Sequence, residues 1–253
     1  MNNQTYYFQG NLKKTLSYIV FSTISIIFSA VAVEDRQQQD IPQHQNTELH
    51  IRKGDNLSST LERNIGNLQF LRKLSLHGCK IGDDGISTIL LVANNIAALE
   101  YLDLTENNIT TAGCARLNTL LSRLPNLQSL NLSHNSINKI GIKLFKDSLK
   151  NLPNLTYLNL GCNNEVYTSN YNGIEEILDV LTNCRFSRTL REISLCNMHI
   201  SNDDGILLAS IITRERFPNL QEVHFYDMGL GQGALKNAVL NMPPCKWDGR
   251  DEK

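Results

Sequence analysis

Two acidic stretches are the first places in this 253-residue sequence where chemistry could occur. GDDG at 82–85 and NDDG at 202–205 each place two carboxylates beside a glycine, which at first suggests a cation-binding loop. Neither stretch has the carboxylate spacing or the closing glutamate of a calcium loop. Both recur in phase with a longer repeat, so we expect their carboxylates at helix starts, where they satisfy free N–H groups and favour the helix dipole. The aspartates concerned are Asp83, Asp84, Asp203 and Asp204.

The six histidines form no recognisable catalytic or metal-binding motif. His77, His134 and His224 are predicted at strand-face positions, where they could meet a partner, although solvated surface histidines are the simpler interpretation. The sequence contains no nucleophile motif such as G-x-S-x-G, no P-loop and no zinc pattern. We therefore predict no catalytic residue, no metal, no cofactor and no enzymatic activity.

The six cysteines leave the redox state open, because their spacing is not that of a compact disulfide framework. Cys162 and Cys196 fall just before the same position in neighbouring repeats, so a bridge between them is geometrically conceivable. Small buried or half-buried thiols are the simpler interpretation.

An internal repeat identifies the elements that must position these residues. The pattern LxxLxLxxNxI occurs first in LRKLSLHGCKI at 71–81 and again in LEYLDLTENNI at 99–109. The remaining copies are LQSLNLSHNSI (127–137), LTYLNLGCN (155–163), LREISLCNMHI (190–200) and LQEVHFYDMGL (220–230). The slot residues of the first four copies, Cys79, Asn107, Asn135 and Asn163, follow one another at intervals of 28 residues, and Met198 and Met228 take the slot in the last two. Gly85, Gly113 and Gly141 mark the same period.

Each copy predicts a short strand followed by a helix. The leucines of LxL point inward, and the slot asparagine can bond to backbone groups that the following turn leaves unpaired. After each glycine the spacing becomes helical, as in GCARLNTLLSRLPN, where the leucines recur at three and four residues. Since parallel strands lie about 4.8 Å apart and packed helices roughly 8 to 10 Å apart, the stacked copies should curve.

The repeated pattern resembles the leucine-rich repeat family, and the 28-residue period with a helix in each copy is similar to its ribonuclease-inhibitor-like subtype. The resemblance covers residues from about 67 to 242. It implies an α/β solenoid, a curved horseshoe segment with short parallel strands on the concave face and helices on the convex face. It also implies binding to proteins, which in this family include inhibited enzymes, regulated GTPases and sensed receptors.

The N-terminal region predicts export. Residues 15–33 carry no charge and follow Lys13 and Lys14, and an A-x-A cleavage site lies at 30–32. An uncleaved membrane anchor is the alternative, because the segment is close to the roughly 20 residues that span a bilayer. In both cases the repeats would lie outside the cytoplasm. The predicted parts are a signal peptide or anchor (1–32), a polar linker and N-terminal cap (33–66), the repeat domain (67–242) and a polar tail (243–253).

On such a stack, the residues between the leucines line up in columns that present a broad surface to another protein. The columns are Lys73, Tyr101, Ser129, Tyr157, Glu192 and Glu222; then Ser75, Asp103, Asn131, Asn159, Ser194 and His224; then His77, Thr105, Ser133, Gly161, Cys196 and Tyr226. Aromatic side chains dominate binding hot spots, and the acidic residues favour a partner with a basic surface. The predicted partner-binding residues are Tyr101, Asp103, Glu106, His134, Tyr157, Glu192, Glu222, His224, Tyr226 and Asp227.

The predicted function is thus that of a protein-binding module acting through its concave face, and by analogy an exported effector of a host-associated microbe. A regulator of a GTPase or enzyme and a membrane-anchored recognition module are the alternatives, and binding through the insertion at 163–173 competes with concave-face binding. The formal net charge of -1 provides no basic footprint for nucleic acid, and a membrane would be contacted only through residues 15–33. The oligomeric state is left open.

Overall fold

The computed structural model describes residues 47–163, 174–197 and 202–224. The chain divides into two units, Met1–His44 and Gln45–Lys253, and all elements described below belong to the second. The predicted signal or anchor segment, 1–32, and the predicted tail, 243–253, lie outside the described residues. Within the described ranges, no helix has the length and apolar character needed to cross a membrane.

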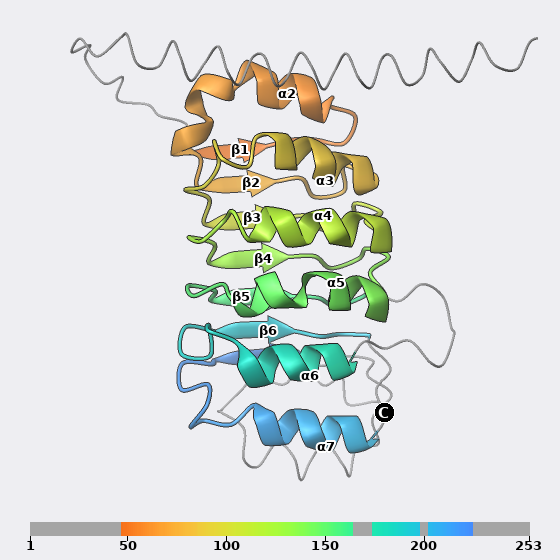
Figure 1. Cartoon of the computed structure of the whole chain (residues 1–253), viewed down its shortest axis with the longest axis vertical. Coiled ribbons are helices and arrows are strands. Elements are labelled where there is room, and N and C mark those ends of the chain that lie inside the picture. The colour runs from red at the N-terminus through yellow and green to blue at the C-terminus, as the bar shows by residue number, and fades with distance from the viewer. Residues whose placement is uncertain (1–46, 164–173, 198–201, 225–253) are drawn as a thin grey trace, which may run out of the picture. The chain divides into compact units, whose positions relative to one another are not determined.

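In the described residues, seven three-residue strands form one open parallel sheet, with neighbours in chain order. They are β1 (Glu48–His50), β2 (Lys73–Ser75), β3 (Tyr101–Asp103), β4 (Ser129–Asn131), β5 (Tyr157–Asn159), β6 (Glu192–Ser194) and β7 (Glu222–His224). Figure 1 shows the strands stacked from β1 onward in the order of the sequence. The short LxL strands of the repeat prediction are therefore confirmed.

A helix separates each strand from the next, as parallel pairing requires. The helical elements are α2 (Leu57–Arg63), the 3-10 helix η1 (Ile65–Phe70), α3 (Gly82–Leu91), α4 (Thr111–Leu121), α5 (Lys139–Lys150), α6 (Ile174–Asn183) and α7 (Asn202–Ile211). In Figure 1 the helices are stacked in the same order as the strands. The predicted α/β solenoid is confirmed.

The first strand lies before the predicted repeats, within the region predicted as a linker and cap. β1 pairs in parallel with β2, and Leu49 lies opposite Leu74. Ile51, just after β1, is buried and its N–H donates to the carbonyl of Ser75 at 3.0 Å. The segment lacks the LxxLxLxxN frame, so periodicity did not reveal this strand. β1 and α2 cover the first complete repeat, as a terminal cap of a solenoid must.

The core consists of leucine columns that run through the stack. Leu102, Leu130 and Leu158 are opposite one another on β3, β4 and β5, and all are buried. The helical leucines predicted to face inward are buried too, namely Leu117, Leu120, Leu121 and Leu124. Each such side chain contributes roughly 1.5 to 3 kcal/mol, and because neighbouring repeats share these contacts, stability is collective.

The slot asparagines form a buried ladder of hydrogen bonds between repeats, as the pattern predicts. Asn135 Nδ2 donates to the carbonyl of Leu104 in the preceding repeat at 2.9 Å, and its Oδ1 accepts from the N–H groups of Asn107 and Ile109 at 3.0 Å each. Asn107 and Asn163 make equivalent cross-repeat bonds. Cys79 occupies the slot with a weaker donor, and its Sγ lies 3.0 Å from the carbonyl oxygen of Ile51. The ladder therefore joins each of these four turns to the turn before it.

The acidic stretch at 82–85 also joins repeats. Asp83 lies in the first turn of α3 as predicted, but its carboxylate accepts from the N–H and hydroxyl of Thr110, the residue that precedes α4, at 2.8 and 2.7 Å. A Cβ added to Gly113 would lie 2.3 Å from Asp83 Oδ1. The periodic glycine at this position is thus explained by the close approach of the neighbouring helix start.

Candidate functional site

The candidate site is the strand face, which we define as the outward-facing residues of the first two predicted columns. Strand alternation turns the central leucine inward and its two neighbours outward. The observed register confirms both columns: Lys73, Tyr101, Ser129, Tyr157, Glu192 and Glu222 are successive partners, and so are Ser75, Asp103, Asn131, Asn159, Ser194 and His224. The structure extends the columns to Glu48 and His50 on β1.

Two half-buried tyrosines dominate the middle of the first column. Ser129 lies between Tyr101 and Tyr157, on the strand between theirs, so a short side chain separates the two rings. Lys73 Nζ lies 5.1 Å from the centroid of the Tyr101 ring, within cation–π range. Burial raises the pKa of both phenols, so both hydroxyls stay protonated and able to donate near neutral pH.

The three Asp and Asn side chains of the second column bond to the backbone of their own strand ends. The Oδ1 atoms of Asp103, Asn131 and Asn159 each accept the N–H two residues later, at 3.0, 3.1 and 3.0 Å. These bonds satisfy donors where each strand ends, which is a typical use of Asp and Asn side chains. Asp103, a predicted partner-binding residue, is consequently buried, and its Oδ1 also accepts from the hydroxyl of Thr105.

Glu106 and His134 lie in the turns after β3 and β4. The prediction of a strand-face position for His134 is wrong, because the strand ends at Asn131 and His134 adopts a left-handed φ of 54°. Glu106 takes the equivalent position with φ 56°, and Gly78 with φ 68°. Gly78 indicates a left-handed turn at this position of the repeat, because glycine adopts positive φ angles without strain.

These turns border a hollow of about 430 Å³ that the repeat pattern does not predict. It is lined by Lys53, His77, Gly78, Lys80, Glu106, Asn108 and His134. Two predicted partner-binding residues, Glu106 and His134, therefore line the same hollow. This hollow lies at the edge of the strand face rather than on it.

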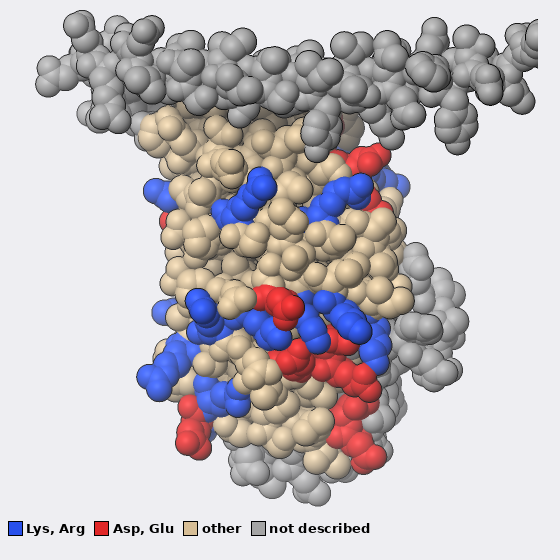
Figure 2. Space-filling model, viewed as in Figure 1, with Lys and Arg blue, Asp and Glu red and all other residues tan. Residues whose placement is uncertain are grey.

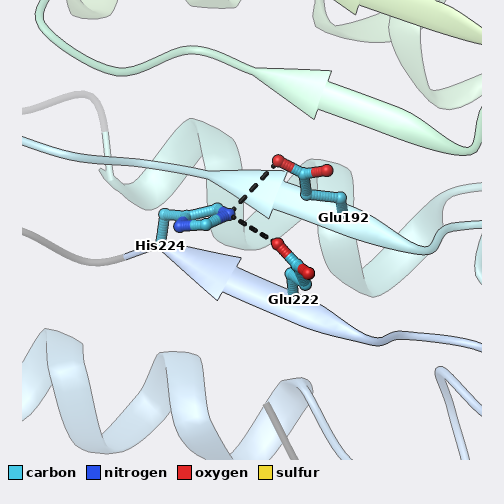
Figure 3. A group of neighbouring side chains, drawn as sticks. All are labelled: Glu192, Glu222 and His224. Atoms are coloured by element: carbon cyan, nitrogen blue, oxygen red, sulfur yellow. Dashed lines mark ion pairs between the residues drawn. The ribbon is translucent and has the colours of Figure 1, made fainter. Parts of the chain in front are cut away.

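Three predicted residues meet at the C-terminal strands. His224 Nε2 lies 3.2 Å from Glu192 Oε1 and 3.5 Å from Glu222 Oε2. Figure 3 shows Glu192 on β6 and Glu222 and His224 on β7, with the imidazole directed toward both carboxylates. This end of the strand face is acidic. Tyr226, Asp227 and most of the insertion, residues 164–173, lie outside the described residues.

Five cysteines lie within the described ranges. None of them forms a disulfide, so Cys162 and Cys196 are not bridged to each other. Burial raises the pKa of Cys114 to about 12 and that of Cys184 to about 11. These two thiols therefore stay protonated at neutral pH and behave as packing residues.

On the helical side, an ion-pair network joins α5 to α6. Lys146 Nζ lies 2.8 Å from Asp179 Oδ2 and also pairs with Glu176, while Lys150 Nζ lies 3.3 Å from the same Asp179 oxygen. Figure 2 shows charged side chains gathered over these two helices. The hydrogen bond from Lys146 is the main reason that the pKa of Asp179 falls from 3.8 to about 2.

We expect Asp179→Asn to reduce the acid sensitivity of folding. The unfolded chain binds this proton near the ordinary pKa of 3.8 and the folded chain only near 2, so the stabilisation is present above about pH 4 and is lost as the pH falls toward 2. The variant should be less stable at pH 7 by about 1 kcal/mol, a figure reduced for solvent screening, and should converge with the wild type near pH 2.

Urea unfolding at a series of pH values measures this effect. Asp147→Asn is the matched control, because Asp147 pairs with Lys150 but its side chain is 76% exposed. An equal pH dependence in the Asp179 variant and the wild type would contradict the assignment.

Residues 67–90, 98–117 and 123–146 match the model of the Leucine Rich repeat. Seven strands in one parallel sheet, alternating with helices at the repeat period, define an α/β repeat solenoid. The matched residues are therefore leucine-rich repeats, and stacked repeats of this class form extended protein-binding surfaces.

Among curated proteins, none matches the sequence. A crystal structure of a protein from Bacteroides fragilis is similar with a TM-score of 0.45 and 14% identity, over 82% of this chain and 66% of that chain. An internalin from Listeria monocytogenes is similar with a TM-score of 0.32 and 17% identity, over 77% of this chain and 70% of that one. The chain thus spans just under two thirds of the Bacteroides protein.

Proposed function

We propose that this chain binds a partner protein through its strand face, with Tyr101 and Tyr157 as the central anchors. The observation that carries the proposal is the placement of these two half-buried rings on either side of Ser129 in one strand column. The short serine side chain makes the two rings the largest side chains at this part of the column. Tyrosines with restricted motion give a large contact area at a low entropic cost, which is why they are enriched in binding hot spots.

The anchors are held in place by neighbouring side chains. Asn159 Nδ2 donates to the hydroxyl oxygen of Tyr157 at 3.2 Å, and Lys73 lies over the ring of Tyr101. Both rings therefore have defined orientations before a partner arrives. Preorganisation of this kind lowers the entropic cost of binding.

The charge of the strand face supports a partner with a basic surface. Glu192 and Glu222 lie one and two strands beyond Tyr157, in the same column. A lysine or arginine of the partner could contact these carboxylates while a second one stacks on Tyr157, much as Lys73 lies over Tyr101. Complementary charge would raise the association rate and exclude acidic partners.

The alanine variants Tyr101→Ala and Tyr157→Ala test the proposal. Each should cost about 2 kcal/mol of binding free energy, or about 30-fold in Kd, because each removes an anchor. The measurement begins with a pull-down by the full-length chain from lysates of candidate host cells and of the source cell. The affinity of the captured partner is then measured for each variant.

The matched controls are Ile140→Ala and Leu144→Ala on α5, which also remove exposed hydrophobic side chains but lie off the strand face. Controls and wild type should bind alike. A partner that binds the tyrosine variants as tightly as the wild type would refute the strand-face assignment and direct attention to the segment 164–173.

We also propose that the repeats act outside the cytoplasm, as an exported effector. The support is the pair of lysines at 13 and 14, the uncharged segment 15–33 and the A-x-A sequence at 30–32. Mass spectrometry of the chain recovered from its native cells tests this. Cleavage predicts Val33 as the first residue, an intact N-terminus indicates the anchored alternative, and an intact chain in the cytosolic fraction contradicts both.

A further inference from the structure

The cluster of Glu192, Glu222 and His224 has the composition of a metal site. Each residue offers one ligand atom, and the three atoms lie within 4.8 Å of one another. The residues come from two strands and two repeats, so no local motif reveals them. His224 Nε2 is shielded from solvent. Figure 3 shows it directed toward both carboxylates.

The separations agree with a small divalent cation. Zinc binds histidine nitrogen and carboxylate oxygen at about 2.0–2.2 Å, which places tetrahedral ligands roughly 3.3–3.6 Å apart. The distances from His224 Nε2 to the two carboxylate oxygens are 3.2 and 3.5 Å. The remaining separation, between the two carboxylates, can close by rotation of flexible glutamate side chains. Two of the three ligand separations are thus already close to those of a tetrahedral zinc site.

The charges also favour a cation. Glu192 and Glu222 lie directly opposite each other on adjacent strands, a placement that is unfavourable for like charges. A divalent ion bound by both carboxylates and a neutral imidazole would cancel their charge. The imidazole nitrogen favours zinc or a similar transition metal over calcium or magnesium, which prefer oxygen ligands.

The opposite end of the sheet provides an internal comparison. β1 carries the same Glu-x-His pair, with Glu48 and His50 in the columns of Glu222 and His224. The residue opposite Glu48 is Lys73, whose Nζ lies 3.5 Å from Glu48 Oε2. Lys73 thus provides a positive charge opposite Glu48. The residue opposite Glu222 is instead a second carboxylate, Glu192.

We propose that Glu192, Glu222 and His224 bind a single divalent transition-metal ion, with Zn²⁺ as the best fit. Three protein ligands leave the fourth position open to water or to a group of a bound partner. The inference does not depend on the proposed protein binding, since metal affinity is measured on the chain alone. Contact of a basic partner group with Glu192 and Glu222 applies to the metal-free chain.

Calorimetric titration of the full-length chain with Zn²⁺ at neutral pH tests the site. We expect one equivalent to bind, with affinity at least 10-fold weaker in Glu192→Gln, Glu222→Gln and His224→Gln. The matched controls Glu48→Gln and His50→Gln should bind within twofold of the wild type. Thermal unfolding without metal checks that each variant folds. If His224→Gln fails to fold, the isosteric variants Glu192→Gln and Glu222→Gln still test the site.

A second readout distinguishes this site from the free cysteines. Co²⁺ bound here should give visible absorption of a low-coordinate ion without the intense near-ultraviolet bands of thiolate ligation. Absence of Zn²⁺ binding, binding that the three variants leave unchanged, or thiolate bands with Co²⁺ would each overturn the proposal.

Discussion

Replacing Asn135 by alanine is expected to lower the free energy of unfolding by about 3 to 5 kcal/mol. The side chain is buried and satisfies the N–H groups of Asn107 and Ile109 and the carbonyl of Leu104, all in the preceding repeat. Each buried polar group left without a partner costs about 1 to 3 kcal/mol. The loss falls on the contact between two repeats, so the whole stack should be affected rather than one turn.

Urea unfolding followed by circular dichroism measures this change. Asn135→Asp adds a second test, because it keeps the acceptor but removes the donors and places a charge beside carbonyl oxygens; we expect it to be at least as damaging. Asn126→Ala is the control: the Asn126 amide also donates to a backbone carbonyl of the preceding repeat, that of Ala97 at 3.1 Å, but it is exposed. A loss below about 1 kcal/mol for Asn135→Ala would refute the importance of the ladder.

Leu130→Ala is expected to cost about 3 to 5 kcal/mol. Leu130 is 0% exposed and lies on the central strand β4, between Leu102 and Leu158 of the neighbouring strands. Truncation removes apolar contacts and leaves a cavity, and leucine-to-alanine changes in tightly packed cores fall in this range. Strands on both sides restrict collapse around the cavity, which places this site toward the upper part of the range.

The same substitution at Leu144 of α5 is the matched control, because that side chain is 41% exposed. We expect it to change stability by less than about 1 kcal/mol, and the difference between the two variants isolates the effect of burial. Equal losses in the two variants would contradict the described core. A change in the urea m-value would show that the array no longer unfolds as one unit.

The two stability predictions concern residues whose roles were readable from the repeat. The slot asparagines, the inward leucines and the pairing of Lys73 with Tyr101 all follow from the 28-residue interval, and the observed register agrees with them. Parallel strands of a solenoid are equivalent by translation along the stack. A residue therefore meets its counterpart one period away, wherever the period is constant.

The candidate site was predictable only in part, because alignment in a column does not determine what a side chain contacts. Asp103 belongs to the predicted column but is turned toward its own backbone and buried. His134 was assigned to a strand that ends before it. Tyr101 and Tyr157 remain half-exposed as the prediction requires. Their role in binding is still a prediction.

By itself, then, the sequence determined the repeat, the strand register and the column assignments, since these depend on backbone geometry that recurs at a constant interval. Only the tertiary structure placed β1 beside β2, joined Lys146 to Asp179 across two helices, and brought His224 against Glu192 and Glu222. The physical reason is that these features depend on side-chain contacts between neighbouring repeats. Such contacts are set by rotamers and packing in three dimensions, which a one-dimensional period does not encode.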